Sequence, residues 1–327
     1  MNLLPFEKIK REILTKQETS SNKEFGKNPE DRDIEELLKY GIINVNKPEG
    51  PTSHQITAYL KEILHIEKAG HSGTLDPKVT GSLPTAIEKA TRIVQSLLTS
   101  GKEYICLMKI HEEKEEKEIR EIMNSFIGKI EQLPPVRSAV KRRIRTREIY
   151  YLEILEIEDR NVLFRVGCQA GTYIRKLCHD IGQKLETSAH MAQLIRTKAG
   201  PFREDTWHSL QEIKDAYEFY KEGDEKPLKK IILPIEKAID HLPKIWITDS
   251  TVDAICHGAE LAIPGIAKIH SKINKKDSVA IMTLKDELVA TGIAELNSEE
   301  IIKKNKGIAA KTKKIFMAYD IYPKIEK

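Results

Sequence analysis

The clearest chemical candidate in the sequence is Asp76, because of the residues that surround it. It lies in the run His71-Ser72-Gly73-Thr74-Leu75-Asp76-Pro77-Lys78-Val79-Thr80-Gly81. Pro77 biases Asp76 toward an extended conformation and restricts the chain after it, so the loop would present the carboxylate rigidly. Gly73 and Gly81 allow another backbone or a nucleotide to approach closely. The run therefore predicts either a catalytic carboxylate or an ordinary Asp-Pro turn between two helices.

A second group of side chains could serve the same site, although each also has an ordinary interpretation. Tyr104 is flanked by Ile105 and Leu107 in a strand-like run, where a tyrosine commonly packs in the core. Arg175 falls in the first turn of a predicted helix, where an arginine commonly forms a surface ion pair. Three further candidates would otherwise be plain loop or core residues, namely His71, Ile174 and Leu194.

Basic residues are concentrated in one short segment. Six occur within eleven positions without an acidic residue between them, namely Arg137, Lys141, Arg142, Arg143, Arg145 and Arg147. A charged run is usually a solvated surface. A run with this many positive charges and no negative charge could also bind the phosphate backbone of a nucleic acid. The net charge of +4 for the whole chain does not distinguish these interpretations.

The elements that position these residues follow from apolar spacing and turn residues. A short strand is predicted at 41–46, and the Pro- and Gly-rich segment 47–51 predicts a turn. Thr52 and Gln55 resemble a capping box that opens a helix ending near His65. Further along, the sequence predicts a loop at 68–84, helices at 85–98 and 172–185, and strands at 103–110, 151–157 and 162–166. Strands mixed with helices predict an α+β catalytic body.

Composition divides the chain of 327 residues into three parts, because this length is too great for one ordinary core. Residues 1–37 are polar and predict an N-terminal extension. Residues 38–240 carry the mixed pattern, which breaks at His241-Leu242-Pro243-Lys244. Short β-type runs separated by glycines then predict a small β-barrel at 241–327.

Cysteine spacing and apolar runs exclude several classes of protein. The four cysteines are far apart, without a C-x-x-C pair that would indicate zinc or a redox dithiol. Nucleotide-binding G-x-G-x-x-G, P-loop and H-E-x-x-H motifs are absent. No apolar run of roughly 18 residues or secretory leader is present, which predicts a cytoplasmic protein without a membrane partner.

Several motifs in matching order resemble those of the pseudouridine synthases that modify the tRNA T loop. Besides the Asp76 run, they are Lys102-Glu103-Tyr104, Gly171-Thr172-Tyr173-Ile174-Arg175, Leu194-Ile195-Arg196-Thr197 and Pro134-Pro135-Val136-Arg137-Ser138-Ala139-Val140-Lys141. Others resemble the RNA-guided branch, the catalytic subunit of H/ACA ribonucleoproteins, whose eukaryotic member is dyskerin. These are the segments 141–147, 190–192 and 198–202 and the block from Leu242. The resemblance covers about residue 38 to the end.

The resemblance implies a fold and roles for the site residues. The fold would be a mixed, largely antiparallel sheet with helices, followed by an RNA-binding PUA barrel. Asp76 matches the family's carboxylate, which could attack the ribose, attack the uracil ring or remove a ribose proton. Arg175 matches the arginine that pairs with this carboxylate. Tyr104 matches the tyrosine that stacks on uracil. No cofactor and no metal are implied.

The family also extracts the target nucleotide from its stack before reaction, because a stacked uridine is not reachable. His71 matches the side chain that fills the vacated space, while Ile174 and Leu194 would line the pocket and exclude water. The segment containing Lys141, Arg142, Arg143, Arg145 and Arg147 would bind RNA. Lys268 would do so in the PUA domain, against which the N-terminal extension would pack.

The implied partners are an H/ACA guide RNA, rRNA and tRNA substrates, and small accessory proteins of the ribonucleoprotein. Two alternatives stay open, namely a stand-alone tRNA enzyme and a non-catalytic RNA-binding scaffold. The sequence also departs from the family pattern. Ile195 stands where arginine is frequent, and Ser82 replaces an apolar residue, which predicts a change in packing only. The chain lacks the lysine-rich tail of dyskerin, which favours an archaeal-like member.

Overall fold

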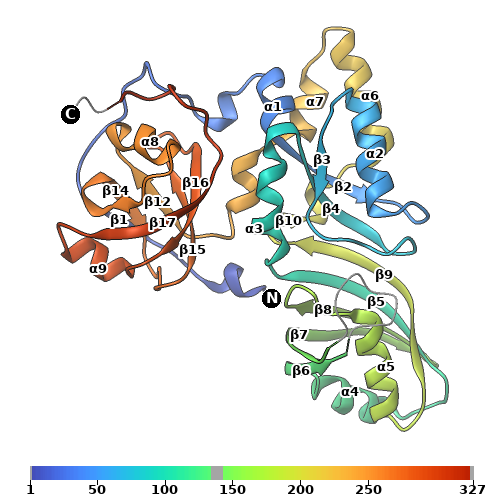
Figure 1. The fold of residues 1–327 in the computed structure, drawn as a ribbon. Coiled ribbons are helices and arrows are strands. Elements are labelled where there is room, and N and C mark those ends of the chain that lie inside the picture. The colour runs from blue at the N-terminus through green and yellow to red at the C-terminus, as the bar shows by residue number, and fades with distance from the viewer. Residues whose placement is uncertain (1, 134–142, 325–327) are drawn as a thin grey trace.

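The computed structural model describes residues 2–133 and 143–324, and two β-sheets form the framework of this part of the chain (Figure 1). Helices pack on the larger sheet, and the smaller sheet forms a separate β-rich lobe. The prediction of an α+β body followed by a C-terminal β-domain is therefore confirmed.

The larger sheet carries the segment around Asp76. Its central strands run in the order β2, β4, β9, β5, β8, β7, β6. Their bounds are β2 (Gly41–Lys47), β4 (Thr80–Ile87), β9 (Ala189–Ala199), β5 (Lys102–Ile110), β8 (Asn161–Cys168), β7 (Arg145–Glu158) and β6 (Gly128–Gln132). Short strands extend it, namely β3 (Ala69–His71) on β4, β10 (Phe202–Arg203) on β9 and β11 (Leu233–Pro234) on β2. The β4–β9 pair is parallel, and the loop that carries Asp76 leads into β4, an interior strand between β2 and β9.

Helices cover this sheet and bury its apolar residues. Their bounds are α1 (Ile34–Tyr40), α2 (Ser53–Leu64), α3 (Val94–Leu98), α4 (Glu116–Asn124), α5 (Ile174–Lys184), α6 (Leu210–Lys221) and α7 (Lys226–Ile231). The predicted capping box of Thr52 and Gln55 opens α2, which ends at His65 in a left-handed conformation. Leu177, Cys178 and Ile181 of α5 are fully buried, as the helical spacing predicts. Within the described residues, no helix has the length and apolarity to span a membrane.

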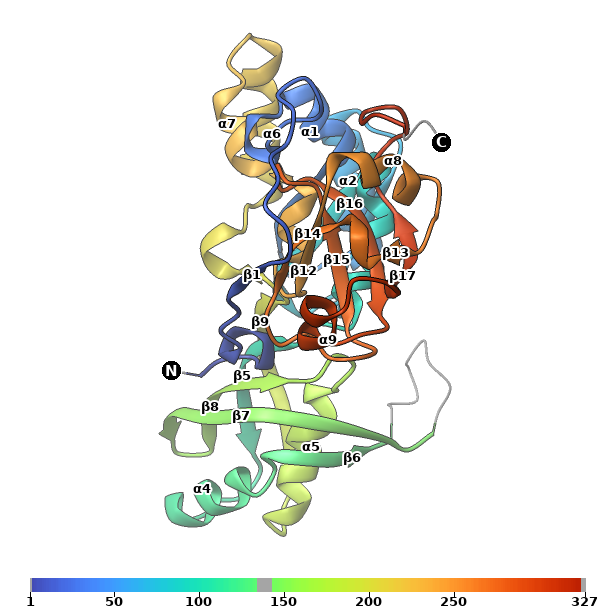
Figure 2. The same cartoon turned by 90° about the vertical axis from the view of Figure 1, so that its left-hand side faces the viewer.

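The smaller sheet has the order β1, β14, β12, β15, β16, β17, β13. The bounds are β1 (Ile13–Thr15), β14 (Ile266–His270), β12 (Lys244–Ile247), β15 (Ser278–Met282), β16 (Leu288–Ala294), β17 (Ile308–Ile315) and β13 (Leu261–Ala262), with helices α8 (Asp249–Cys256) and α9 (Ser298–Lys303). Strand β1 comes from the N-terminal segment and pairs with β14, Ile13 opposite His270. Figure 2 shows this segment running from β5 and β9 across the smaller sheet.

One predicted helix is wrong. Residues 85–98 were expected to be helical, but β4 extends to Ile87 and is followed by a 3-10 helix at Glu88–Ile93. The α-helical part begins only at Val94. The reason is tertiary, because residues 85–87 of β4 pair with β2 on one side and with β3 on the other, and pairing within the sheet outweighs local helical spacing.

Buried neutral histidines predict acid sensitivity. Burial lowers the pKa of His241 to about 4, and its Nε2 lies 3.2 Å from the carbonyl oxygen of Ser96. Since the unfolded chain would bind a proton near pH 6.5, stability from His241 is complete above that pH and is lost as the pH falls toward 4. We expect the melting temperature of His241→Leu to decrease less than that of the parent when the pH is lowered from 7 to about 4.5. Equal losses, measured by thermal unfolding, would contradict a neutral buried His241.

Candidate active site

Asp76 lies in the loop between β3 and β4, and a residue at the start of α2 binds the backbone of this loop. Ser53 is fully buried, and its Oγ accepts a hydrogen bond from Leu75 N at 2.8 Å and donates one to Leu75 O at 3.1 Å. The carbonyl oxygen of Asp76 accepts from Val79 N at 2.9 Å, which closes a turn around Pro77. The Asp76 side chain itself is 54% exposed. The backbone is therefore fixed while the carboxylate faces solvent.

Lys47 fixes the other side of the loop. Its side chain is fully buried at the end of β2. Its Nζ donates to the carbonyl oxygens of Pro48 at 2.8 Å, Pro77 at 3.0 Å and Val79 at 2.9 Å. Burial lowers the pKa of Lys47, and the charge of Asp76 acts in the opposite direction. One ammonium group thus satisfies three carbonyls of the loop that carries Asp76.

Arg175 forms an ion pair with Asp76 from the first turn of α5. Both side chains are about half exposed, and such a pair contributes only about 0–1 kcal/mol to stability. The helix start is fixed by Gln132 of β6, which is buried. Its Oε1 accepts from Tyr173 N at 2.9 Å, and its Nε2 donates to Tyr173 O at 3.1 Å. The structure therefore brings Asp76 and Arg175 together, as the resemblance implies.

Tyr104 lies on β5 directly opposite Arg196 of β9. Arg196 is buried, and its guanidinium donates to the carbonyl oxygens of Ser82 at 2.7 Å and Gly73 at 3.2 Å. It therefore links the Asp76 loop to the strand that carries Tyr104. Burial raises the pKa of the Tyr104 hydroxyl, against the opposing charge of Arg196, so the hydroxyl is protonated at neutral pH.

His71 ends β3, at the entrance to the Asp76 loop. Its ring packs edge-on against that of His54, with centroids 5.1 Å apart. Burial lowers the pKa of His71 to about 4, with His54 and Arg196 acting in the same direction, so the imidazole is neutral at physiological pH. Ile174 and Leu194 are 3% and 8% exposed and belong to the same hydrophobic core as Leu75 of the Asp76 loop.

The basic segment lies next to the start of α5. Arg145 and Arg147 of β7 pair with Gln132 and Ile130 of β6. The Arg147 guanidinium lies so near Gly171 that a Cβ there would be 3.2 Å from it. Arg143 is exposed just before β7. The predicted residues Lys141 and Arg142, and Arg137 of the same run, lie outside the described part of the chain.

Lys268 is not brought to this site. It lies on β14 in the smaller sheet, opposite Thr15 of β1 and Trp246 of β12. Its predicted RNA contact would therefore belong to a separate surface.

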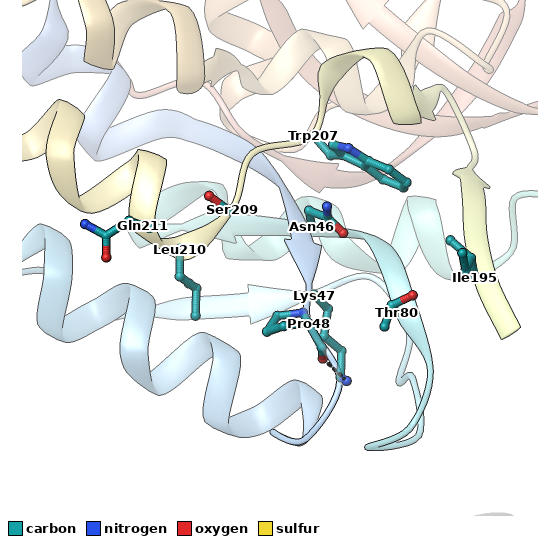
Figure 3. Close-up of a pocket in the computed structure, with 9 residues that line it drawn as sticks. All are labelled: Asn46, Lys47, Pro48, Thr80, Ile195, Trp207, Ser209, Leu210 and Gln211. Atoms are coloured by element: carbon teal, nitrogen blue, oxygen red, sulfur yellow. Dashed lines mark hydrogen bonds between the residues drawn. The ribbon is translucent and has the colours of Figure 1, made fainter. Parts of the chain in front are cut away.

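A nearby pocket is distinct from the Asp76 site (Figure 3). Its volume is about 450 Å³, and its lining residues are Asn46, Lys47, Pro48, Thr80, Ile195, Trp207, Ser209, Leu210 and Gln211. It contains none of the predicted catalytic residues and no carboxylate. Ile195 lines it, whereas its neighbours Leu194 and Arg196 point to the other face of β9 as strand alternation requires. Among the described residues, no cluster of three or more potential His, Cys, Asp or Glu ligands could hold a metal.

Sequence reasoning gave no role to Lys47, Ser53, Gln132 or Arg196. A lysine or arginine that ends or interrupts an apolar strand is the signal that could have drawn attention to two of them. Ser82 was expected to alter packing only, and this is wrong. Its buried Oγ donates to Asn44 Oδ1 at 2.7 Å, so it belongs to a polar network beneath the loop.

Family models match the chain almost from end to end. Residues 61–174 match the N-terminal domain of the TruB family of pseudouridylate synthases, and residues 175–240 match a C-terminal domain of tRNA pseudouridylate synthase B. Residues 243–316 match a PUA domain, and residues 2–57 match a DKCLD domain.

Curated and solved relatives agree with these matches. A probable tRNA pseudouridine synthase B of Pyrococcus furiosus is 57% identical over 97% of this chain and 94% of its own length. Its counterpart in Methanosarcina barkeri is 52% identical over 98% and 95%. A Cbf5-Nop10-Gar1 complex contains a chain that superposes with a TM-score of 0.95, at 55% identity, over 99% of both chains. An H/ACA ribonucleoprotein bound to a substrate RNA gives a TM-score of 0.92 at 53% identity, over 98% and 99%.

Proposed function

The chain belongs to the TruB family of pseudouridylate synthases, and from that premise we propose that it isomerises uridine in RNA under the direction of an H/ACA guide RNA. The observation that carries the proposal is the Asp76–Arg175 ion pair on a loop fixed by Lys47 and Ser53. A carboxylate on a rigid backbone, open to solvent, is available to a nucleotide that enters from outside.

The reaction breaks the bond between N1 of uracil and C1′ of ribose and joins C1′ to C5. The C5 proton leaves and N1 gains a proton, so the composition of the RNA is unchanged. We assign Asp76 as the group that initiates this exchange, by attack on the ribose or ring or by removal of a ribose proton. Arg175 orients the carboxylate and meets a phosphate beside the target nucleotide.

The other residues would hold the extracted base. The ring of Tyr104 stacks on uracil, which is worth about 1–3 kcal/mol. His71 replaces the base in its former stack, and its neutral ring avoids the cost of burying a charge there. Ile174 and Leu194 keep water from the reacting bond.

We assign the chain three functional parts, namely an extension at 1–37, the synthase domain at 38–240 and a PUA domain at 241–327. The division follows the two sheets, and the PUA part would bind guide RNA through Lys268 and its neighbours. Relatives solved with Nop10 and Gar1 or with a substrate RNA support small accessory proteins and an RNA substrate as partners, and we propose rRNA as that substrate. We also propose a cytoplasmic location for the chain.

A second candidate is guide-free modification of tRNA, which the names of the curated relatives support. The test is pseudouridine formation by the purified chain on a guide-paired RNA and on an unmodified tRNA transcript, each with and without guide RNA and accessory proteins. Product that requires the guide and accessory proteins supports guided action. Full activity on tRNA alone supports the second candidate, and no product under any condition would leave an RNA-binding scaffold.

The basic segment supports a further prediction on RNA affinity. Replacing Arg143, Arg145 and Arg147 together with glutamine should weaken binding of all RNA sequences. It should also reduce the slope of log affinity against log salt by about 2–3, since each neutralised phosphate contributes roughly 0.7–0.9. Filter binding between low and moderate salt measures the slope. The matched control replaces Lys226, Lys229 and Lys230 of distant α7 with glutamine. An unchanged slope in the variant of Arg143, Arg145 and Arg147 would show that the basic segment is a solvated surface.

A further inference from the structure

A β-bulge lies beside Tyr104 and is fixed by a buried acidic residue that the proposed mechanism does not use. Glu103 of β5 pairs with Lys198 of β9, but Tyr104 pairs with Arg196. Thr197 is therefore an extra residue without a partner on β5. Such bulges bend a strand and redirect the neighbouring side chain, and they frequently occur next to active sites.

Glu103 makes a hydrogen bond with each carboxylate oxygen, one to the bulge and one to β7. Its side chain is only 7% exposed. Oε1 accepts from the Thr197 hydroxyl at 2.8 Å, and Oε2 accepts from the Tyr151 hydroxyl of β7 at 2.5 Å. Burial together with this bond raises the pKa of Tyr151, which keeps it a donor. Lys198 Nζ lies 3.7 Å from Oε2 and supplies the opposite charge.

The N-terminal segment completes this arrangement. Glu7 Oε2 lies 3.1 Å from Lys198 Nζ and accepts from Leu4 N at 2.7 Å, and the Leu4 side chain is fully buried. Lys198 thus lies between two carboxylates from segments almost a hundred residues apart in sequence. Figure 2 shows the N-terminus beside β5 and β9, in agreement with these contacts.

We propose that Glu103 is a positioning residue for Tyr104, with Glu7 as its support through Lys198. This inference rests on the proposed function, because it requires Tyr104 to hold the uracil. Consecutive strand residues point to opposite faces, so a carboxylate anchored on one face fixes the aromatic ring on the other. A misplacement of about 1 Å at a reacting group can lower a rate by about a hundredfold, so a modest release of the bulge would be measurable.

The test is Glu103→Gln, which keeps the side-chain size but removes the charge that three groups share. Under single turnover we expect the rate of pseudouridine formation to fall by about tenfold with unchanged RNA affinity. Glu7→Gln should lower it less, because Glu7 acts only through Lys198. The control is Glu153→Gln on β7, which weakens a partly exposed pair with Arg165, keeps an oxygen for the Asn2 amide, and should keep the parent rate.

A second readout needs no catalysis, so its failure is distinguishable from failure of the proposed function. In protein labelled with 3-fluorotyrosine, the Tyr104 resonance is identified by its loss in Tyr104→Phe. It should shift or broaden in Glu103→Gln and stay in place in Glu153→Gln. A lower rate with an unmoved Tyr104 resonance, or an unchanged rate, would overturn the proposal.

The Thr197 hydroxyl gives an independent pair of variants in case Glu103→Gln fails to fold. Thr197→Val loses the donor to Glu103, whereas Thr197→Ser keeps it. We expect Thr197→Val to reproduce the slow rate and the moved resonance, and Thr197→Ser to restore both to near the parent values. Identical behaviour of the two variants would show that the hydroxyl, and with it the anchored carboxylate, does not position Tyr104.

Discussion

Asp76→Asn is expected to abolish pseudouridine formation while RNA binding stays nearly intact. Asparagine has the shape of aspartate but lacks the charge and basicity that each route to glycosidic cleavage needs. The loop should keep its conformation, because Lys47 and Ser53 bind its backbone. The Asp76 side chain takes no part in these hydrogen bonds. Loss of an essential nucleophile or base commonly costs about 10⁴-fold or more. Single-turnover product assays and filter binding measure the two quantities.

A matched control for this variant lies on the helix that carries Arg175. Asp180→Asn removes a carboxylate that pairs with Lys176 on the surface of α5 and should leave turnover close to that of the parent. Normal turnover by Asp76→Asn would remove Asp76 from the mechanism. Loss of RNA binding in parallel with turnover would assign Asp76 a role in substrate binding instead.

The second large effect is expected for Lys47→Met. Methionine fills a similar volume but leaves the carbonyls of Pro48, Pro77 and Val79 without their shared donor. Each buried unsatisfied polar group costs about 1–3 kcal/mol, so the melting temperature should fall clearly and the Asp76 loop should lose its fixed position. We expect product formation to fall by about a hundredfold, because the carboxylate would no longer lie in reach of the ribose.

The exposed neighbour Lys78 provides the control for this change. Lys78→Met makes the same substitution at an exposed position of the Asp76 loop itself. Thermal unfolding and single-turnover assays of both variants separate stability from loop position. An unchanged melting temperature and rate in Lys47→Met would contradict the role of Lys47 as the fixed point of the loop.

Local sequence signals predicted the elements that flank the site. The capping box at Thr52, the hairpin of β7 and β8 and the apolar face of α5 depend on residues close in sequence, and each was found where predicted. The error at 85–98 has a different origin. The first residues of that segment, 85–87, join β4 through pairing with β2 and β3, whose residues lie outside the segment.

The same distinction applies to the site. The resemblance drew attention to Asp76 and Arg175, which the structure brings into contact. It gave no role to Lys47, Arg196 and Glu103, whose buried charges are satisfied by backbone carbonyls or by hydroxyls from other strands. These partners appear only once the sheet has formed. Sequence therefore identified the side chains that we propose face the substrate better than those that hold them.

The central claim is that the target uridine reacts beside Asp76 and Tyr104 and not in the neighbouring pocket of Figure 3. The most direct measurement is photo-crosslinking of RNA that carries 4-thiouridine at the target position, bound to the Asp76→Asn variant, followed by mass spectrometry of the linked peptides. The account predicts crosslinks to β5 at Tyr104 or to the loop that carries Asp76. Crosslinks confined to the segment around Trp207 would contradict it.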